Sequence, residues 1–294
     1  MLEQTYQVLK SGTDIRGIAA EGVPGQEIQL TDEVAQNIGY GFACWLEDKL
    51  TPSYGATFTV AVGHDSRISA DRLTDAIIKG LTLAGVHVKN CGLSSTPAMF
   101  MTTVNFDCDA AVEITASHHP FNRNGFKFFT KTGGIESGEV SEILNLAENA
   151  PKEPAMEPGT VTDMPYMNNY AEQLRSMICE GINADDYARP LRDFKIAVDA
   201  GNGAGGFYAT KVLEPLGADI TGSQFLEPDG MFPNHVPNPE DKTAMASVSD
   251  LCIVQMQDYL TLGEESRMNF PGTMTTNNWT WRAWDGFASD ALAE

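Results

Sequence analysis

The residues best suited to chemistry lie together in residues 115–132, TASHHPFNRNGFKFFTKT. This stretch contains no Asp or Glu, although the whole chain has 40 acidic residues against 19 Lys and Arg. A serine and two histidines stand beside Arg123 and Lys127. A serine hydroxyl can carry a phosphoryl group, and cationic side chains bind phosphate oxygens. The sequence therefore predicts an anion-binding loop in which Ser117 is the nucleophile or phosphate carrier.

The bulk composition excludes several classes of partner. The formal net charge of -21 argues against nucleic acid and anionic membranes, because like charges repel. Five dispersed cysteines without a CxxC pair argue against a disulfide framework or a zinc site and favour a reducing compartment. No apolar run approaches the roughly 18 residues of a membrane span, and the first residues lack a signal-peptide pattern. We expect a cytoplasmic location, or a plastid if a leader precedes this sequence; the oligomeric state stays open.

Strand and helix patterns predict how the serine loop is positioned. Residues 58–63 (FTVAVG) have the pattern of a buried strand, a helix follows from about Ser69 to Gly85, and residues 86–88 begin the next strand. This βαβ order implies parallel strands. The other expected elements flank this unit: helices capped at Thr31 and Ser137, and strands at residues 110–115 and 126–130.

A proline-rich stretch, residues 149–165, divides the chain. Beyond it we expect a helix over residues 170–178, and residues 194–200 (FKIAVDA) then repeat the earlier strand pattern. The predicted fold is α/β: tandem three-layer α/β/α domains with mostly parallel mixed sheets, plus an irregular C-terminal tail. The expected limits are residues 1–150 for the first domain, 151–165 for a linker, 166–250 for a partial second domain, and 251–294 for an unrelated or frameshifted tail.

One glycine pattern supports a rival function. Gly201, Gly203 and Gly206 spell GxGxxG between an expected strand and helix, which is the layout of dinucleotide-binding loops. Asp199 stands directly before the glycines, where its charge would oppose a pyrophosphate. A single GxGxxG is a weak signal, so an NAD(P)-binding α/β enzyme remains the minor alternative.

Several stretches together resemble one family, the α-D-phosphohexomutases. TASHHP is similar to the phosphoserine loop of that family, usually written TASHNP. The resemblance covers about residues 10–250 and is nearest in wording to the plant and algal branch. The other stretches follow in the family's order: GTDIRG (12–17), VGHDSR (62–67), NGFKFF (124–129), VDAGNGAGG (198–206) and EPDGMFPNHVPNPE (227–240).

The resemblance implies a phosphoglucomutase, phosphomannomutase or phosphoglucosamine mutase activity. Such an isomerase transfers a phosphoryl group within hexose phosphates through a phosphoserine, with hexose 1,6-bisphosphate as activator and Mg²⁺ as metal. Ser117, as phosphoserine, would be the nucleophile and a metal ligand. Lys127 would be a proton shuttle or phosphoryl clamp, Arg16 a phosphoryl clamp, and His118 an orienting group. Further contacts to substrate or phosphate are expected from His64, Arg67, His119, Arg123 and Asn124.

Two departures from the family pattern bear on activity. His119 replaces the asparagine of TASHNP, which puts the substrate preference in doubt. The family holds Mg²⁺ with three aspartates of a DGDxDR-type loop, and no D-x-D-x-D follows Asp250. We therefore expect a truncated, catalytically impaired member whose enzyme status is open, or a non-catalytic phosphosugar-binding remnant. The change near residue 251 is consistent with a frameshift, a mispredicted exon or a genuine alternative C-terminus.

Overall fold

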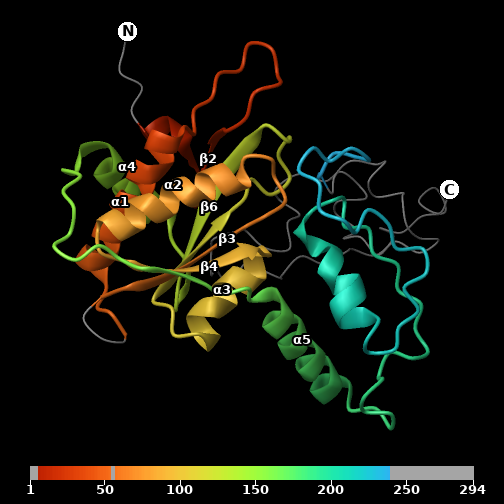
Figure 1. Ribbon diagram of the computed structural model, residues 1–294. Helices are drawn as coiled ribbons and strands as arrows, with labels where there is room; N and C mark the ends of the chain where they lie inside the picture. Colours follow the sequence, from red (N-terminus) through yellow and green to blue (C-terminus); the bar gives the residue numbers. More distant parts are fainter. Residues whose placement is uncertain (1–5, 54–56, 239–294) are drawn as a thin grey trace, which may run out of the picture. The chain divides into compact units, whose positions relative to one another are not determined.

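The computed structural model describes residues 6–53 and 57–238 of the chain (Figure 1). The strands are β1 (Lys10–Ser11), β2 (Asp14–Ile18), β3 (Thr59–His64), β4 (His87–Leu93), β5 (Ala110–Ile114), β6 (Arg123–Thr130), β7 (Gly133–Gly134) and β8 (Val161–Asp163). The α-helices are α1 (Asp32–Lys49), α2 (Ala70–Leu83), α3 (Thr96–Asn105), α4 (Ser137–Asn149) and α5 (Met167–Ile182). Shorter helical turns are η1 (Tyr6–Leu9), η2 (Ala204–Gly206) and the π-helical η3 (Tyr208–Leu213).

The strands form one mixed sheet in the order β1-β2-β6-β5-β3-β4-β8, with β7 beside β6. Strands β5, β3, β4 and β8 are parallel, whereas β6 is antiparallel to both β5 and β2. The β3–α2–β4 unit confirms the parallel crossover expected from the sequence. The antiparallel placement of β6 brings the end of β5 and the start of β6 to the same edge, joined by residues 115–122.

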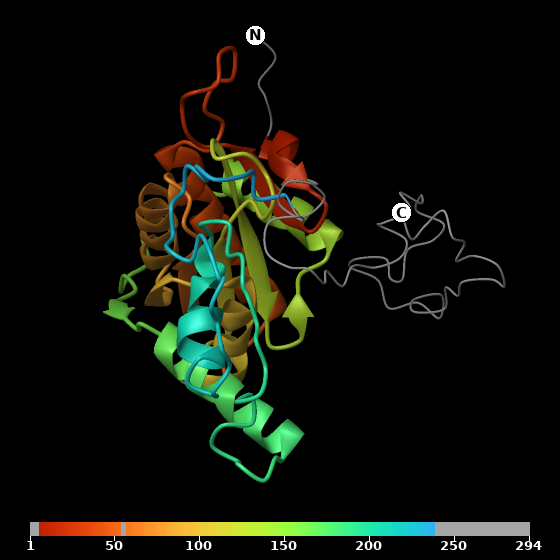
Figure 2. The same ribbon diagram turned by 90° about the vertical axis from the view of Figure 1, so that its right-hand side faces the viewer.

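Two helical layers cover the sheet, which confirms the predicted three-layer α/β arrangement for this part of the chain (Figures 1 and 2). Because side chains alternate along a strand, Val60 and Val62 of β3 face the core formed with α1, α2 and α4, while Ala61 faces α3 and α5. The first of these cores is the larger. Its biggest fully buried side chains include Trp45, Phe42, Phe126, Phe128 and Leu46.

Helix ends follow the expected capping chemistry, with one difference. The Thr31 hydroxyl accepts a hydrogen bond from the Val34 amide (3.2 Å), as predicted for the start of α1. Helix α4 begins one position earlier than the Ser137 cap implied, because Glu136 and Glu139 form a capping box. The two caps fix where α1 and α4 begin.

Part of the expected linker belongs to the sheet. Residues 161–163 form β8 and pair in parallel with β4, with Val161 opposite Val88. The proline-rich composition of residues 149–165 concealed this strand, since its side chains are exposed and lack the apolar alternation of the buried strands. The linker therefore extends the sheet before the chain enters α5.

Residues 166–238 form less regular structure than the sequence predicts. The strand expected at residues 194–200 is present as two isolated parallel bridges, Lys195 to Asp219 and Asp199 to Gln224. The helix expected after the glycines is divided into η2 and η3. The compact unit that holds all described residues spans Met1–Ser249, so separate domain limits stay a prediction. The expected tail, residues 251–294, lies outside the described residues.

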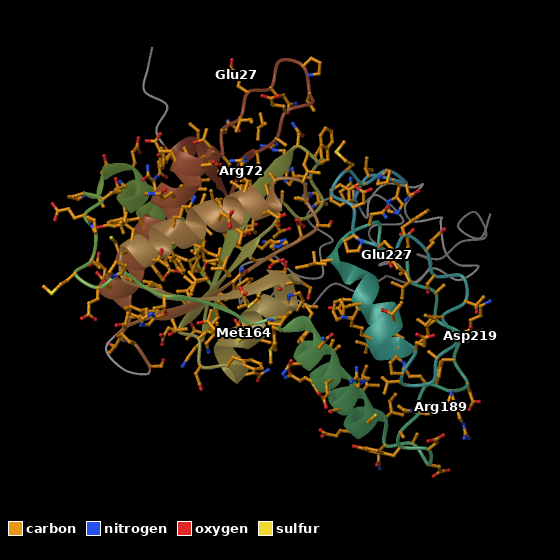
Figure 3. The ribbon with its side chains drawn as sticks, in the orientation of Figure 1. Glu27, Arg72, Met164, Arg189, Asp219 and Glu227 are labelled. Carbon is orange, nitrogen blue, oxygen red and sulfur yellow. The ribbon has the colours of Figure 1, made fainter. Side chains whose placement is uncertain are left out.

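A surface loop before α1 is fixed by one arginine. Arg72 of α2, labelled in Figure 3, donates to the carbonyl oxygens of Ala19 (2.6 Å) and Leu30 (3.0 Å). Glu27, also labelled, lies on the loop between those two residues. None of the described helices has both the length and the apolar character needed to cross a membrane.

Candidate active site

The serine loop is shaped by its own hydrogen bonds. The Thr115 hydroxyl accepts a hydrogen bond from the Ser117 amide (2.9 Å), and the Ala116 carbonyl accepts one from the His119 amide (3.1 Å). Ser117 has φ 55°, in the left-handed region that non-glycine residues rarely occupy. Its side chain is exposed. Such backbone strain is retained where the surroundings enforce it, and it presents the Ser117 hydroxyl outward.

Two of the predicted cations meet at one carboxylate beside this loop. Lys127 Nζ lies 2.7 and 2.9 Å from the two carboxylate oxygens of Asp14, and Arg16 Nη2 lies 2.7 Å from the Asp14 Oδ2 atom. Arg16 Nη1 also donates to the Ala116 carbonyl (3.4 Å). Asp14 is nearly buried, so it holds both cations next to the loop in a fixed geometry.

The pairing of β2 with β6 makes this convergence possible. Arg16 lies directly opposite Gly125 in the antiparallel register. A Cβ atom at residue 125 would lie 2.1 Å from the Ile15 carbonyl oxygen, so glycine is needed for the two strands to approach. Gly125 of the NGFKFF stretch is therefore a point of close backbone approach.

The two histidines of the loop stack on each other. Their ring centroids are 4.9 Å apart at 20°. Burial, followed in effect by the positive charges of Arg16, Arg123, His118 and Arg67, lowers the pKa of His119 to about 4. His119 is therefore neutral near pH 7, and one ring nitrogen is available as a hydrogen-bond donor. His118 is exposed.

Arg67 is buried and contacts the backbone of the serine loop. Its guanidinium group donates to four backbone carbonyl oxygens of the loop and pairs with Asp65 (3.2 Å), and its side chain has no exposed surface. The four acceptors are Ser117 (2.7 Å), His119 (2.7 Å), Pro120 (2.7 Å) and Arg123 (2.9 Å). These contacts make Arg67 a residue that positions Ser117.

Two other predicted residues lie at the border of the site. Asn124 is fully buried, donates to the Ser69 hydroxyl (3.0 Å) and accepts from the Gly125 amide. His64 contacts the Asp65 carbonyl (2.8 Å) through Nδ1 and lies 3.6 Å from Asp71 through Nε2. Asn124 thus ties the serine loop to the start of α2, and the substrate roles predicted for both residues stay predictions.

Sequence reasoning missed three residues that build the site. Asp14 joins the cations and Thr115 shapes the serine turn. Glu113 of β5 lies opposite Lys127 in the register and is buried. Asp14 and Thr115 stood within the motifs already singled out, GTDIRG and TASHHP, whereas Glu113 gave no signal because a strand residue's partner depends on register.

The described residues do not fit a Mg²⁺ site. Among them, no group of three or more His, Cys, Asp or Glu side chains could hold a metal ion. The side chains around Ser117 are mainly cations, whereas Mg²⁺ requires several close oxygen ligands. We therefore derive no chemical step through a metal.

Comparison with family models gives two matches. Residues 8–153 match the model described as phosphoglucomutase/phosphomannomutase, alpha/beta/alpha domain I. Residues 223–285 match the model described as 4-alpha-glucanotransferase. Most of the second match lies outside the described residues.

Curated relatives and solved structures agree with the first match. A phosphoglucomutase of Neisseria meningitidis serogroup B is 34% identical over 226 residues, which are 77% of this chain and 44% of that protein. A phosphoglucosamine mutase of Ruminiclostridium cellulolyticum is 34% identical over 227 residues, 74% of this chain and 46% of that protein. A phosphoglucomutase/phosphomannomutase family protein from Burkholderia thailandensis superposes with a TM-score of 0.67 at 25% identity, covering 83% of this chain and 50% of that one.

The fold and the site define an α/β/α domain with a serine loop between a parallel and an antiparallel strand. With the matches above, the chain belongs to the phosphohexomutase family, as the sequence predicted. It spans less than half the length of the curated relatives it matches. The plant and algal branch stays a prediction.

Proposed function

We propose that Ser117 accepts a phosphoryl group from a hexose bisphosphate, as the first half of an exchange between hexose phosphates. In this step the Ser117 Oγ atom forms an ester bond to phosphorus, the bond from phosphorus to the sugar oxygen breaks, and the proton lost from the Ser117 hydroxyl is replaced by one gained on that sugar oxygen as a new hydroxyl proton. The observation that carries the proposal is the convergence of Arg16 and Lys127 on Asp14 beside the exposed Ser117. Positioning and charge stabilisation account for most of the catalysis of phosphoryl transfer.

Each cationic residue has a separate part in the proposal. Arg16, fixed by Asp14 and by the Ala116 carbonyl, binds two phosphoryl oxygens with its planar fork. Lys127 supplies a second positive charge and exchanges a proton with the reacting oxygen. His119 donates a hydrogen bond as a neutral ring. The same arginines that lower the pKa of His119 attract a phosphate dianion to this place.

The substrate class is proposed from the relatives. They are named phosphoglucomutase and phosphoglucosamine mutase, so the phosphoryl donor is a hexose 1,6-bisphosphate and the product a hexose monophosphate. The family resemblance implies Mg²⁺ on the phosphoserine, but the described residues contain no group of three or more His, Cys, Asp or Glu side chains that could hold it. Which hexose is preferred depends on His119, where the family's usual pattern has asparagine.

Labelling tests the serine directly. The chain is incubated with glucose 1,6-bisphosphate carrying ³²P, and phosphopeptides are mapped. We expect label in the peptide of residues 115–123, loss of label in Ser117→Ala, and retention in Ser176→Ala, a surface serine of α5. Label elsewhere, or none under conditions that label an intact mutase, would contradict the proposal.

We propose further that this chain alone turns over hexose phosphates slowly. The described residues supply no cluster of three or more ligating side chains for Mg²⁺, and loss of such charge stabilisation costs on the order of 4 kcal/mol in the barrier. A coupled assay with Mg²⁺ and bisphosphate activator measures this. Rapid turnover that disappears in Ser117→Ala would overturn the proposal of impairment while supporting the site.

The remaining alternatives differ in ligand. Gly206 lies against Leu226, and a Cβ atom there would approach the Leu226 carbonyl oxygen to 1.9 Å. Asp199 accepts the Gly201 amide (2.8 Å), so this carboxylate occupies a backbone donor that a pyrophosphate would need. A thermal shift with glucose 6-phosphate but not with NAD⁺ supports a phosphosugar-binding protein, and the reverse supports the dinucleotide enzyme.

A second candidate function rests on the match to the 4-alpha-glucanotransferase model over residues 223–285. We propose that this stretch contacts an α-1,4-glucan. Three of the four tryptophans, Trp279, Trp281 and Trp284, fall within it, and the fourth, Trp45, is buried in the sheet domain. Maltoheptaose should therefore change tryptophan fluorescence, with cellohexaose as control, and an unchanged spectrum would argue against glucan binding.

A further inference from the structure

Arg67 has a second set of contacts, with residues outside the serine loop. The ring of Phe232 lies with its centroid 5.1 Å from the Arg67 Cζ atom, within the range of a cation–π interaction. Gly230 forms a parallel bridge with Arg67 itself. The arginine that holds the Ser117 carbonyl is therefore covered by a segment more than 160 positions further along the chain.

The fit between these segments is close. A Cβ atom at residue 230 would lie 2.4 Å from both the Ser66 carbonyl oxygen and the Ile68 amide nitrogen, so only glycine permits this approach. The Ser66 hydroxyl donates to the Asn202 carbonyl (2.9 Å). Residues 66–68 thus lie between the serine loop on one side and two loops of the second region on the other.

Asn202 fixes the segment that carries Phe232. Its side-chain amide donates to the Glu227 carbonyl (2.9 Å), its side-chain oxygen accepts from Asn234 (2.7 Å), and its carbonyl accepts from the Asp229 amide (2.8 Å). Glu227, labelled in Figure 3, marks where this segment begins. The segment is therefore held at both ends around the phenylalanine.

Phe232 occupies a costly backbone conformation. Its φ of 51° lies in the left-handed region, which bulky residues rarely adopt. Asp229 accepts a hydrogen bond from the Met231 amide and forms a turn with Phe232 (3.0 Å), which helps to enforce this conformation. Strain of this kind persists where a contact requires it. The contact that it secures here is the ring of Phe232 over Arg67.

We propose that Phe232 is a positioning residue for Ser117 and acts through Arg67. The ring covers the guanidinium group and keeps water from it, which strengthens its hydrogen bonds to the Ser117, His119, Pro120 and Arg123 carbonyl oxygens. The strained turn at Ser117 is then maintained only while residues 227–235 rest on Arg67. The catalytic part of this inference depends on the proposed phosphoryl transfer, whereas the structural part does not.

Hydrogen exchange tests the structural part on the full chain. We expect Phe232→Leu, which keeps apolar bulk but removes the π face, to speed amide exchange in residues 115–123 by about tenfold. Phe232→Tyr should exchange at the wild-type rate. Met231→Ala is the matched control, because Met231 is next to Phe232 in the sequence and is itself 49% exposed. Ser66→Ala, which removes the bond to Asn202, should raise exchange in the same peptide by a smaller factor.

Labelling of Ser117 tests the catalytic part. In Phe232→Leu the rate of ³²P transfer from glucose 1,6-bisphosphate should fall by about the same tenfold, with the half-saturating bisphosphate concentration unchanged, and Phe232→Tyr should restore it. A Phe232→Leu protein whose serine loop exchanges like Met231→Ala overturns the inference, as does a uniform increase over α1, α2 and the loop. Absence of label in the wild type would refute the proposed function. The exchange result would then still test the structural part, the effect of Phe232 on the serine loop through Arg67.

Discussion

Residues 6–163 and residues 166–238 contain similar strand and glycine patterns but differ in regular structure. In the first region β5 is hydrogen-bonded to β3 on one side and to β6 on the other. In the second, residues 195 and 199 pair only through single bridges with 219 and 224. The regular strand in this comparison is therefore the one whose two neighbours pair with it along its length.

The same contrast is seen in side-chain burial. The strand FTVAVG contributes Val60 and Val62 to a core closed by helices, and both are fully buried. The similar stretch FKIAVDA keeps Phe194 exposed, and Val198 is only partly buried. The first region should therefore respond strongly to core and close-contact substitutions, and the second weakly.

The largest difference between the two regions is expected in the unfolding free energy that is lost when one arginine of each region, Arg67 or Arg192, is replaced. Arg67→Met removes a buried cation and leaves Asp65 and several carbonyl oxygens without their partner, which should cost about 3–5 kcal/mol of unfolding free energy. Arg192→Met removes surface pairs with Asp186 and Asp193 at 3.5 Å and should cost about 0–1 kcal/mol. Urea unfolding measures both, and equal costs would break the comparison.

The next difference concerns two helical glycines. A Cβ atom at Gly80 of α2 would lie 1.9 Å from the Gln36 carbonyl oxygen of α1, so Gly80→Ala should destabilise by about 1–3 kcal/mol. Gly181 of α5 has open space around it, so Gly181→Ala should stabilise by about 0.5–1 kcal/mol. Thermal melting of the two variants should move in opposite directions, and shifts of one sign would contradict the packing described.

The third difference concerns two carboxyl groups. Glu113 is 1% exposed, and its Oε2 atom has no hydrogen-bond partner among the described residues. Burial raises its pKa well above the usual range, the Asp65 charge adds to this, and Lys127 opposes it. Because the folded pKa exceeds the unfolded one, the cost of burying Glu113 is absent below the unfolded pKa of 4.5 and grows as pH rises.

Glu113→Met should therefore stabilise the protein by about 1–3 kcal/mol, with more gain at pH 8 than at pH 4. Asp219 of the second region is exposed, and hydrogen bonds from Thr221 lower its pKa. It contributes stability above the unfolded pKa that is lost as pH falls, so Asp219→Asn should act in the opposite pH direction. Melting curves over pH 4–8 measure both slopes, and parallel slopes would refute the assignment.

The smallest expected effect is a change in the pKa of His119 when Ser117 carries a phosphoryl group. Burial lowers the pKa of His119 to about 4, with Arg16 next in effect, and a phosphoryl group on Ser117 should raise it towards 6.5. Until then the folded pKa lies below the unfolded one, so stability present above pH 6.5 is lost as pH falls towards 4. NMR titration of the imidazole measures this. A pKa of His119 that does not change after phosphorylation would argue against phosphate at Ser117.

Much of the first region was predictable from local pattern. The helices beginning after Thr31 and Ser69 and the strands at residues 58–63 and 110–115 follow from periodicity and capping, and the structure confirms them within a few residues. Strand β8 and the bridges near residues 195–199 were not predictable in this way. Their state depends on which edge is available for pairing, and local sequence does not encode that.

The sequence alone determined which charged and hydroxyl groups the serine loop carries. An acid-free stretch with Ser117, Arg123 and Lys127 in an acidic chain indicated an anion site, and the ordered motifs indicated the family. Only the tertiary structure decided where each cation lies and what it contacts. Register sets Arg16 and Lys127 on Asp14, whereas burial turns Arg67 inward as a support for the loop. Residue type fixes charge and donor geometry, but access to a phosphate depends on contacts between segments far apart in the chain.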